Sequence, residues 1–283
     1  MINYKKPALA LIALLMVPAM SGCGSDSGSD DSGAAVGKSL TVAMDLSIAP
    51  NQYMDNGEPA GFTVELAQAI AAQMGRKLNI VNTPFSTVIT AISTGRYDAG
   101  MAGYLDTLER ENQVDFVSYM VNPGQYLVVP KGNPGNLSAA DLCGGTVGTV
   151  SGSTQEIQLN ELAAKCLTEG KAPLKVKIFG EIPVLLLALK NKQIDGMPLA
   201  PDSAVYLAEQ NPQDMEVIED LVEGMQTGSN WGIMVKKGNA ELAEEFRNAV
   251  DAVIASGKYE EILTKYRIQV YAIDKSAINT ATS

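Results

Sequence analysis

The sequence predicts an α/β protein with mainly parallel sheets. Short apolar segments alternate along the chain with longer segments in which apolar residues recur every three or four positions. This alternation is typical of strands that are connected by helices. Of the 283 residues, 46% are hydrophobic and 19% are charged, so the chain has enough apolar material for one large domain or for two lobes.

The individual elements follow from short apolar runs, helical periodicity and end signals. Ser86 is expected to cap one helix, and Gly75 and Gly95 are expected to end two helices. The expected strands cover residues 40–44, 78–81, 99–102, 127–129, 146–150 and 176–179. The expected helices cover residues 62–74, 86–94, 154–167, 182–189 and 240–255.

One pattern occurs twice in the chain. Residues 88–100 and 184–197 each contain an apolar helix, a polar turn, and then an aspartate before a small residue, Asp98 in the first and Asp195 in the second. The repeat suggests two lobes of similar build. We interpret both aspartates as structural, because such side chains often accept hydrogen bonds from nearby backbone N–H groups.

Charge and composition exclude several classes of protein. The formal net charge is −11, which argues against a nucleic-acid partner, since phosphates require clustered Lys and Arg. The sequence has no histidine, which excludes imidazole metal sites and Ser-His or Cys-His catalysis. Its acids are scattered without the spacing of a calcium loop, and we expect neither a metal nor a cofactor.

The N-terminal residues are expected to form a targeting segment. Lys5 and Lys6 precede the apolar run 8–20, which is too short to span a membrane but suits a secretory signal over residues 1–22. The signal ends at Cys23, and residues 20–23 resemble a bacterial lipobox in which that cysteine is lipidated. An ordinary signal peptide with an incidental cysteine is the alternative. Residues 23–37, rich in Gly, Ser and Asp, are expected to be a disordered tether.

The cysteine count is consistent with this interpretation. If Cys23 carries lipid, Cys143 and Cys166 remain as a pair. Outside the cytoplasm this pair is expected to be oxidised to a disulfide. Two unrelated buried thiols are the alternative.

An ordered set of motifs resembles the bacterial extracellular solute-binding proteins of family 3, the periplasmic amino-acid-binding proteins of ABC importers, in their lipoprotein form. Each motif alone is weak, but their order along residues 38–268 is specific. The matching segments are Gly61-Phe-Thr-Val-Glu-Leu66, Pro84-Phe-Ser86, Gly95-Arg-Tyr-Asp98, Thr107-Leu-Glu-Arg110 with Val114-Asp-Phe116, residues 142–154, and the terminal helix at residues 257–266.

This resemblance implies a two-lobed periplasmic-binding-protein fold of type II-like topology, with the ligand in the cleft between the lobes. Lobe one would comprise residues 38–120 and 230–275, lobe two residues 121–229, and residues 276–283 a flexible tail. The crossovers between lobes are expected near residues 119–124 and 226–231. The implied protein is an extracytoplasmic, membrane-anchored monomer that closes on its solute at a hinge and is then recognised by a membrane permease.

The resemblance also implies which residues hold the ligand. Arg110 would bind the ligand carboxylate with two parallel hydrogen bonds, and the helix N-terminus at Ser153 and Thr154 would bind it from the other lobe. Asp45 would contact the ligand's amine or side chain, and Phe85 would form an apolar wall. Ala102 and Gly103 would offer nearby backbone groups.

The sequence departs from the family pattern at two positions. The family has an aromatic residue where this chain has Ile48, and its ammonium-binding aspartate falls on Ala200. A buried ammonium without a carboxylate partner is costly. We therefore expect either that Asp202 takes this role or that the ligand has no α-ammonium. The position of Trp231, the only tryptophan, is consistent with a place in the cleft or at the hinge.

Two other functions remain as alternatives. The first is a lyase of the cyclohexadienyl-dehydratase type on the same fold, in which Asp45, Glu156 or Glu181 would act as general acid. The second is a sensory or adhesion role without transport. We favour a binding protein over an enzyme because the sequence has no paired-acid motif and no histidine.

Overall fold

The structure, a computed structural model, describes residues 37–225 and 230–282. The expected signal peptide over residues 1–22, the lipid site at Cys23 and all but the last residue of the expected tether lie outside the described residues. So does most of the second expected crossover. Within the described ranges, no helix has the length and apolar character that crossing a membrane requires.

Lobe one is built on a five-stranded mixed sheet with the strand order β5-β1-β6-β13-β7. Strand β1 pairs in parallel with β5 and β6, whereas β13 pairs antiparallel with β6 and β7. The strands are β1 (Gly37–Met44), β5 (Arg76–Asn82), β6 (Ala99–Gly100), β7 (Val114–Val121) and β13 (Asn230–Lys236).

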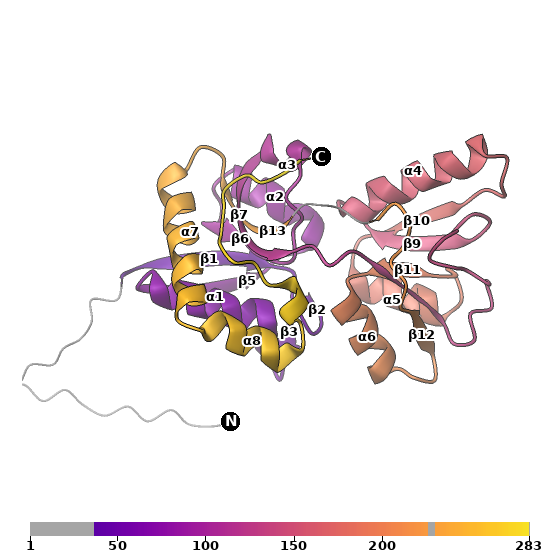
Figure 1. Ribbon diagram of the computed structural model, residues 1–283, viewed down its shortest axis with the longest axis horizontal. Coiled ribbons are helices and arrows are strands. Elements are labelled where there is room, and N and C mark those ends of the chain that lie inside the picture. Colours follow the sequence, from indigo (N-terminus) through magenta and orange to yellow (C-terminus); the bar gives the residue numbers. More distant parts are fainter. Residues whose placement is uncertain (1–36, 226–229, 283) are drawn as a thin grey trace, which may run out of the picture. The chain divides into compact units, whose positions relative to one another are not determined.

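Helices pack on both faces of this sheet. On one face, α1 (Phe62–Gln73), α7 (Ala240–Ala255) and α8 (Lys258–Tyr266) pack against one another, as Figure 1 shows. On the other face, α2 (Phe85–Ser93) contacts β6 and β13. The alternation of side chains along a strand divides the core accordingly: Val42 and Met44 of β1 belong to the first cluster, and Ala43 belongs to the second.

Lobe two contains two smaller sheets. Strands β9 (Thr146–Val150) and β10 (Lys175–Phe179) form a parallel pair, and β8 (Tyr126–Pro130) lies between β11 (Met197–Leu199) and β12 (Met215–Ile218) with antiparallel pairing. The helices of this lobe are α4 (Thr154–Thr168), α5 (Ile182–Lys190) and α6 (Pro201–Gln210). The remaining elements of the chain are β2 (Ser47–Ile48), β3 (Gln52–Asp55), β4 (Glu58–Ala60), α3 (Leu108–Glu111) and η1 (Gln269–Tyr271).

The α/β class and the expected elements are confirmed, but the prediction of mainly parallel sheets is wrong. The helix over 240–255 and the strand over 146–150 match α7 and β9 at both ends. The sheet of lobe one is mixed because β13 runs in the direction opposite to β6 and β7, and the sheets β11-β8-β12 and β2-β3-β4 are antiparallel. The sequence shows where strands begin and end, but not the direction from which a distant segment enters a sheet.

The repeated aspartates have the structural role that we expected. Asp98 accepts a hydrogen bond from the backbone N–H of Thr41 at 2.8 Å, and its own N–H donates to the Thr41 carbonyl at 3.0 Å. Asp195 makes the same pair of contacts with Thr146, at 2.8 and 2.7 Å. Each aspartate therefore fixes the turn after a helix to a strand, β1 in lobe one and β9 in lobe two.

The C-terminal residues differ from the flexible tail that we expected. Asn279 accepts a hydrogen bond from the Phe116 N–H at 2.8 Å, and Ser276 donates to the Ser118 carbonyl at 2.7 Å. The Thr280 N–H donates to Asp106 at 2.7 Å. Residues 276–282 are thus held along β7, where they pair with a strand edge that would otherwise leave backbone groups unsatisfied.

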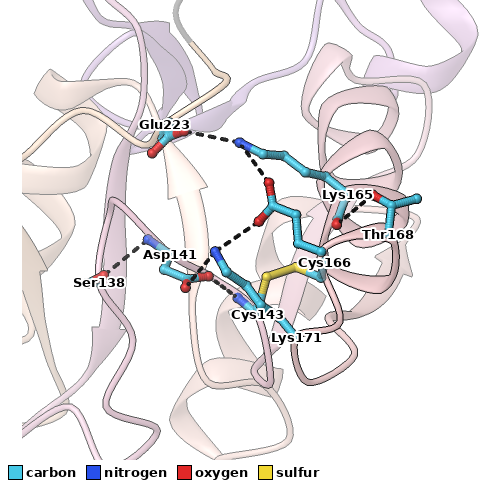
Figure 2. The surroundings of a disulfide bond; sticks show 9 residues. Ser138, Asp141, Cys143, Lys165, Cys166, Thr168, Lys171 and Glu223 are labelled. Carbon is cyan, nitrogen blue, oxygen red and sulfur yellow. Dashed lines mark hydrogen bonds and ion pairs between the residues drawn. A yellow bond between two sulfur atoms is a disulfide. The ribbon is translucent and has the colours of Figure 1, made fainter.

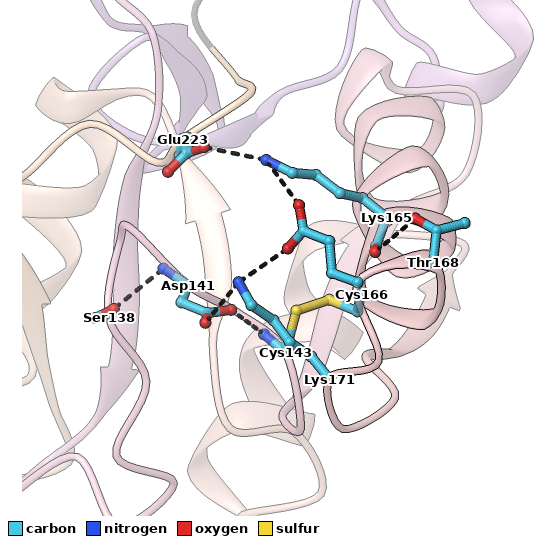
Figure 3. A network of polar contacts seen from close by, with 9 residues as sticks. Ser138, Asp141, Cys143, Lys165, Cys166, Thr168, Lys171 and Glu223 are labelled. Atoms are coloured by element: carbon cyan, nitrogen blue, oxygen red, sulfur yellow. Dashed lines mark hydrogen bonds and ion pairs between the residues drawn. A yellow bond between two sulfur atoms is a disulfide. The ribbon is translucent and has the colours of Figure 1, made fainter.

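The structure confirms a disulfide between Cys143 and Cys166, whose Cα atoms are 5.6 Å apart (Figure 2). It joins the loop before β9 to the C-terminal part of α4. Figure 3 shows the ion pairs around it, in which Lys171 bridges Asp141 and Glu169 at 3.2 and 3.0 Å. These charges are exposed and add little stability, so the covalent bond provides the main link here.

Replacing both cysteines by serine is expected to lower the free energy of unfolding by about 3 kcal/mol. The bridge closes a segment with a sequence separation of 23, and removing it restores the chain entropy of that loop in the unfolded state. Urea unfolding of the oxidised wild type and the double variant measures the difference. Wild type in reductant is the control and should match the variant; equal midpoints under oxidising conditions would contradict the expectation.

Candidate functional site

Residues of lobe one and lobe two line one pocket together. Six of the eight residues that the sequence nominated as ligand contacts lie in its wall: Phe85, Ala102, Gly103, Arg110, Ser153 and Thr154. The two others, Asp45 and Asp202, do not line it. The pocket therefore brings together the residues expected to hold a carboxylate, and leaves out both acids that were expected to hold an amine.

Arg110 lies in the short helix α3, where Thr107 caps the helix by accepting a hydrogen bond from the Arg110 N–H at 3.3 Å. Its guanidinium donates to the Leu105 carbonyl in lobe one and to the Gly152 carbonyl in lobe two, both at 2.9 Å. The side chain is 6% exposed. It thus reaches from its own lobe to the residue before the N-cap of α4.

The guanidinium of Arg110 forms no ion pair with a carboxylate in the described part of the chain. Burial lowers its pKa, which Tyr104 and Glu109 partly offset, and the group nevertheless stays charged because guanidinium remains protonated in proteins. Two carbonyls use only part of its five N–H donors. A buried cation with free donors at a pocket wall is suited to an anionic ligand group.

The N-terminus of α4 contributes a part of the wall from lobe two. The Ser153 hydroxyl caps the helix by accepting from the Glu156 N–H at 3.3 Å, and it donates to the Val150 carbonyl at 2.7 Å. Ser153 is therefore the N-cap of α4, whereas ligand contact by Ser153 and Thr154 stays a prediction. The first turn of such a helix has unpaired N–H groups and a positive dipole end, which complement an anion beside Arg110.

Asp45 supports the pocket from outside its wall. Its carboxylate accepts hydrogen bonds from the Ser47 hydroxyl and, at 2.9 Å, from the N–H of Phe85. The helix α2 begins at Phe85, so Asp45 takes the capping role that we had expected of Ser86. Phe85 lines the pocket and stacks on Tyr104 with ring centroids 4.3 Å apart. The structure therefore places Asp45 as a support for Phe85.

Asp202 is adjacent in sequence to pocket residues but does not line the pocket. It belongs to the first turn of α6, between Ala200 and Ser203, which do line the pocket. Both of its carboxylate oxygens are buried without a hydrogen-bond partner. Burial raises the pKa of Asp202 to about 7. The carboxyl influences Tyr119 and Tyr271 of lobe one.

Trp231 lines the pocket and belongs to β13 of lobe one. Its ring lies beside Gly103, where a Cβ atom would be 3.6 Å from the indole, and its centroid is 6.4 Å from that of Tyr271. The side chain is 5% exposed. Of the two positions left open by the sequence, the structure places the indole at the pocket wall.

The sequence analysis missed the small antiparallel sheet β2-β3-β4. Ile48 of β2 and Asn51, in the turn between β2 and β3, are two further pocket residues. Strands β3 and β4 are joined at Asn56 and Gly57, both with positive φ. An Asn-Gly pair between short strands is a strong hairpin signal, and it was available in the sequence. Asn51 accepts a hydrogen bond from Ser203 of lobe two at 2.9 Å.

The two-lobed α/β fold, with a pocket lined by both lobes and one buried arginine in its wall, defines a solute-binding protein. The model of the bacterial extracellular solute-binding proteins, family 3, matches residues 40–269. The chain belongs to this family.

Curated relatives span nearly the whole chain. The arginine-binding extracellular protein ArtP of Bacillus subtilis is 28% identical over 264 residues, which cover 93% of this chain and 98% of the relative. A probable histidine-binding protein of Neisseria gonorrhoeae is 29% identical over 272 residues, which cover 93% and 96%.

Solved structures confirm the two-lobed fold. An ancestral arginine-binding protein bound to arginine aligns with a TM-score of 0.71 and 32% identity, covering 82% of this chain and 99% of the other. An ancestral amino-acid-binding protein that preceded cyclohexadienyl dehydratase aligns with a TM-score of 0.67 and 26% identity, covering 81% and 95%.

Substituting Asp202 by Asn is expected to stabilise the protein increasingly between pH 4 and pH 7. The folded pKa is raised to about 7 and the unfolded value is about 4, so wild-type stability falls as pH rises through this window. The increase in the free energy of unfolding should be near zero at pH 4 and reach at most about 4 kcal/mol above pH 7, because one pKa unit corresponds to about 1.4 kcal/mol.

Urea unfolding of wild type and variant across this pH range gives the difference. Burial raises the pKa of Asp106 to about 6. Asp106 contributes equally to the pH dependence of stability in both proteins, so its contribution cancels in the difference. The exposed Asp220→Asn is the matched control and should show no such trend. A pH-independent difference for the Asp202 variant would show that this carboxyl ionises normally in the folded protein.

Proposed function

We propose that this protein is the extracytoplasmic substrate-binding component of an ABC importer. It captures a small carboxylate-bearing solute, an amino acid or a close relative of one, and presents it to the membrane permease. The observation that carries this proposal is the buried Arg110, which lines the pocket, pairs with no acid of the described chain, and faces the N-terminus of α4.

Contacts from both lobes support binding by hinge closure. The guanidinium of Arg110 in lobe one bonds to Gly152 in lobe two, and Ser203 in lobe two bonds to Asn51 in lobe one. A ligand carboxylate between Arg110 and α4 would add further contacts to both lobes. Such a ligand binds the closed state better than the open state and shifts the population towards it.

The names of the relatives support an amino acid or related solute. They include arginine-, histidine- and glutamine-binding proteins, several of them described as ABC transporter proteins. The similarity covers almost all of this chain, so the transport role is proposed for the whole protein.

The pocket gives the lyase alternative little support. A dehydratase needs a general acid within reach of its substrate, but Asp45 caps α2 and lies outside the pocket wall. Glu156 accepts a hydrogen bond from the Gly152 N–H at 2.8 Å, and Glu181 is the exposed residue before α5. We therefore favour binding without turnover.

We further propose that the protein acts as a monomer, held at the outer side of a membrane by lipid on Cys23 and a tether over residues 23–37. The lipobox-like sequence at residues 20–23 supports this anchor. The disulfide between Cys143 and Cys166 supports an oxidising compartment.

Arg110→Lys is expected to weaken binding of the solute by about 100-fold, although it retains the positive charge. Lysine cannot reproduce the planar pair of donors, and charge-assisted hydrogen bonds contribute roughly 1.5–3 kcal/mol each. Calorimetric titration with the solute released from natively purified protein measures the loss. The exposed Arg96→Lys is the matched control; unchanged affinity in the Arg110 variant would contradict the proposed role.

Cys23→Ser is expected to release the protein from the membrane fraction into the soluble extracytoplasmic fraction. The substitution removes the thiol that would carry the lipid, and a protein without that chain loses its anchor. Fractionation and metabolic labelling with a clickable fatty acid measure the change. Labelling that persists in the Cys23 variant would place the lipid elsewhere, and absence of labelling in wild type would contradict lipidation.

A further inference from the structure

The wall of the pocket carries one charge. Among the described residues that line it, Arg110 is the single charged side chain, and the others are amides, hydroxyls and apolar groups. Within the described residues, the pocket wall therefore offers a cation to the ligand and no carboxylate.

The acids around the pocket are engaged elsewhere or buried. Asp45 accepts from the Phe85 N–H, and Glu156 accepts from the Gly152 N–H. Both carboxylate oxygens of Asp202 are buried, and burial raises its pKa to about 7, which favours its neutral form. None of the three lines the pocket, so none supplies a counter-charge to a ligand cation there.

This charge pattern distinguishes between ligands that share a carboxylate. The carboxylate would neutralise Arg110, but an ammonium on the same molecule would enter a pocket that already holds a cation and has no acid. Burying an ammonium without a charged partner is costly, because amide oxygens replace only part of its hydration. A guanidinium or imidazolium side chain would meet the same penalty at the far end of the ligand.

The remaining wall indicates the body of the ligand. Burying the apolar groups of a ligand against an apolar pocket surface is favourable. The apolar residues that line the pocket include Ile48, Ile182, Leu185, Leu199, Met225 and Trp231. Gln125 and Gln155 are hydrogen-bonded to each other at 3.0 Å, and they add neutral polar groups beside it.

We propose that the pocket selects a monocarboxylate with an uncharged, largely apolar body, such as a 2-hydroxy or 2-oxo acid, over the amino acid with the same side chain. The proposal rests on the proposed function and narrows its ligand class. The proposal concerns the substituent on the ligand carbon next to the carboxylate, and it does not change the proposed transport role.

The test compares matched ligands by calorimetric titration. The two series are L-leucine with its 2-hydroxy and 2-oxo acids, and L-phenylalanine with its 2-hydroxy and 2-oxo acids, with L-arginine as the cationic probe. We expect at least one hydroxy or oxo acid to bind at least tenfold more tightly than its amino acid, and L-arginine to bind no better than the neutral amino acids.

Two variants isolate the effect of charge. Ala200 lines the pocket and is the residue before the first turn of α6, a position that accepts both aspartate and asparagine. Ala200→Asp supplies the missing acid and should change the preference at least tenfold in favour of the amino acid. Ala200→Asn has nearly the same shape without the charge, so the difference in preference between the two variants isolates the effect of the charge.

The outcomes separate this inference from the proposed function. Tighter binding of an amino acid, including L-arginine, by the wild type overturns the inference and leaves the proposed function in place. Equal preferences in the two Ala200 variants also overturn the inference. Failure of every carboxylate to bind the wild type overturns both.

Discussion

The site depends on one constraint, which is that the charge of Arg110 is buried without an acid partner from the described chain. Its hydrogen bonds to Leu105 and Gly152 partly satisfy the guanidinium and connect the two lobes, but carbonyl dipoles do not neutralise a full charge. The contacts around the pocket keep the charge of Arg110 unpaired. Asp45 caps α2 and Glu156 reaches Gly152, so the nearby acids are held away and the pocket remains positive.

Much of the fold and part of the site could be predicted because they depend on local sequence. Helix periodicity and end signals located most helices and strands, and the repeat around Asp98 and Asp195 predicted the same backbone contacts in both lobes. The residues expected to bind a carboxylate line the pocket because they lie at the ends of strands and helices. The order of the motifs along the chain is enough to predict where these residues lie in the fold, without knowledge of side-chain packing.

What the sequence did not predict depends on contacts between distant residues. The antiparallel entry of β13 and the docking of residues 276–282 along β7 require partners more than a hundred residues away. Spacing alone suggested Asp202 as a replacement for the acid missing at Ala200. In the structure Asp202 lies in the first turn of α6, and its carboxylate oxygens are buried without a hydrogen-bond partner. The orientation of a side chain at a helix start is decided by packing, which spacing does not contain.

A crystal structure of the protein with the solute it retains through native purification tests the central claim most directly. The account predicts a ligand carboxylate within hydrogen-bonding distance of both the Arg110 guanidinium and the N–H groups at the start of α4, enclosed by the two lobes. A ligand that leaves Arg110 without a carboxylate, or whose acidic group lies against another part of the pocket, would contradict it.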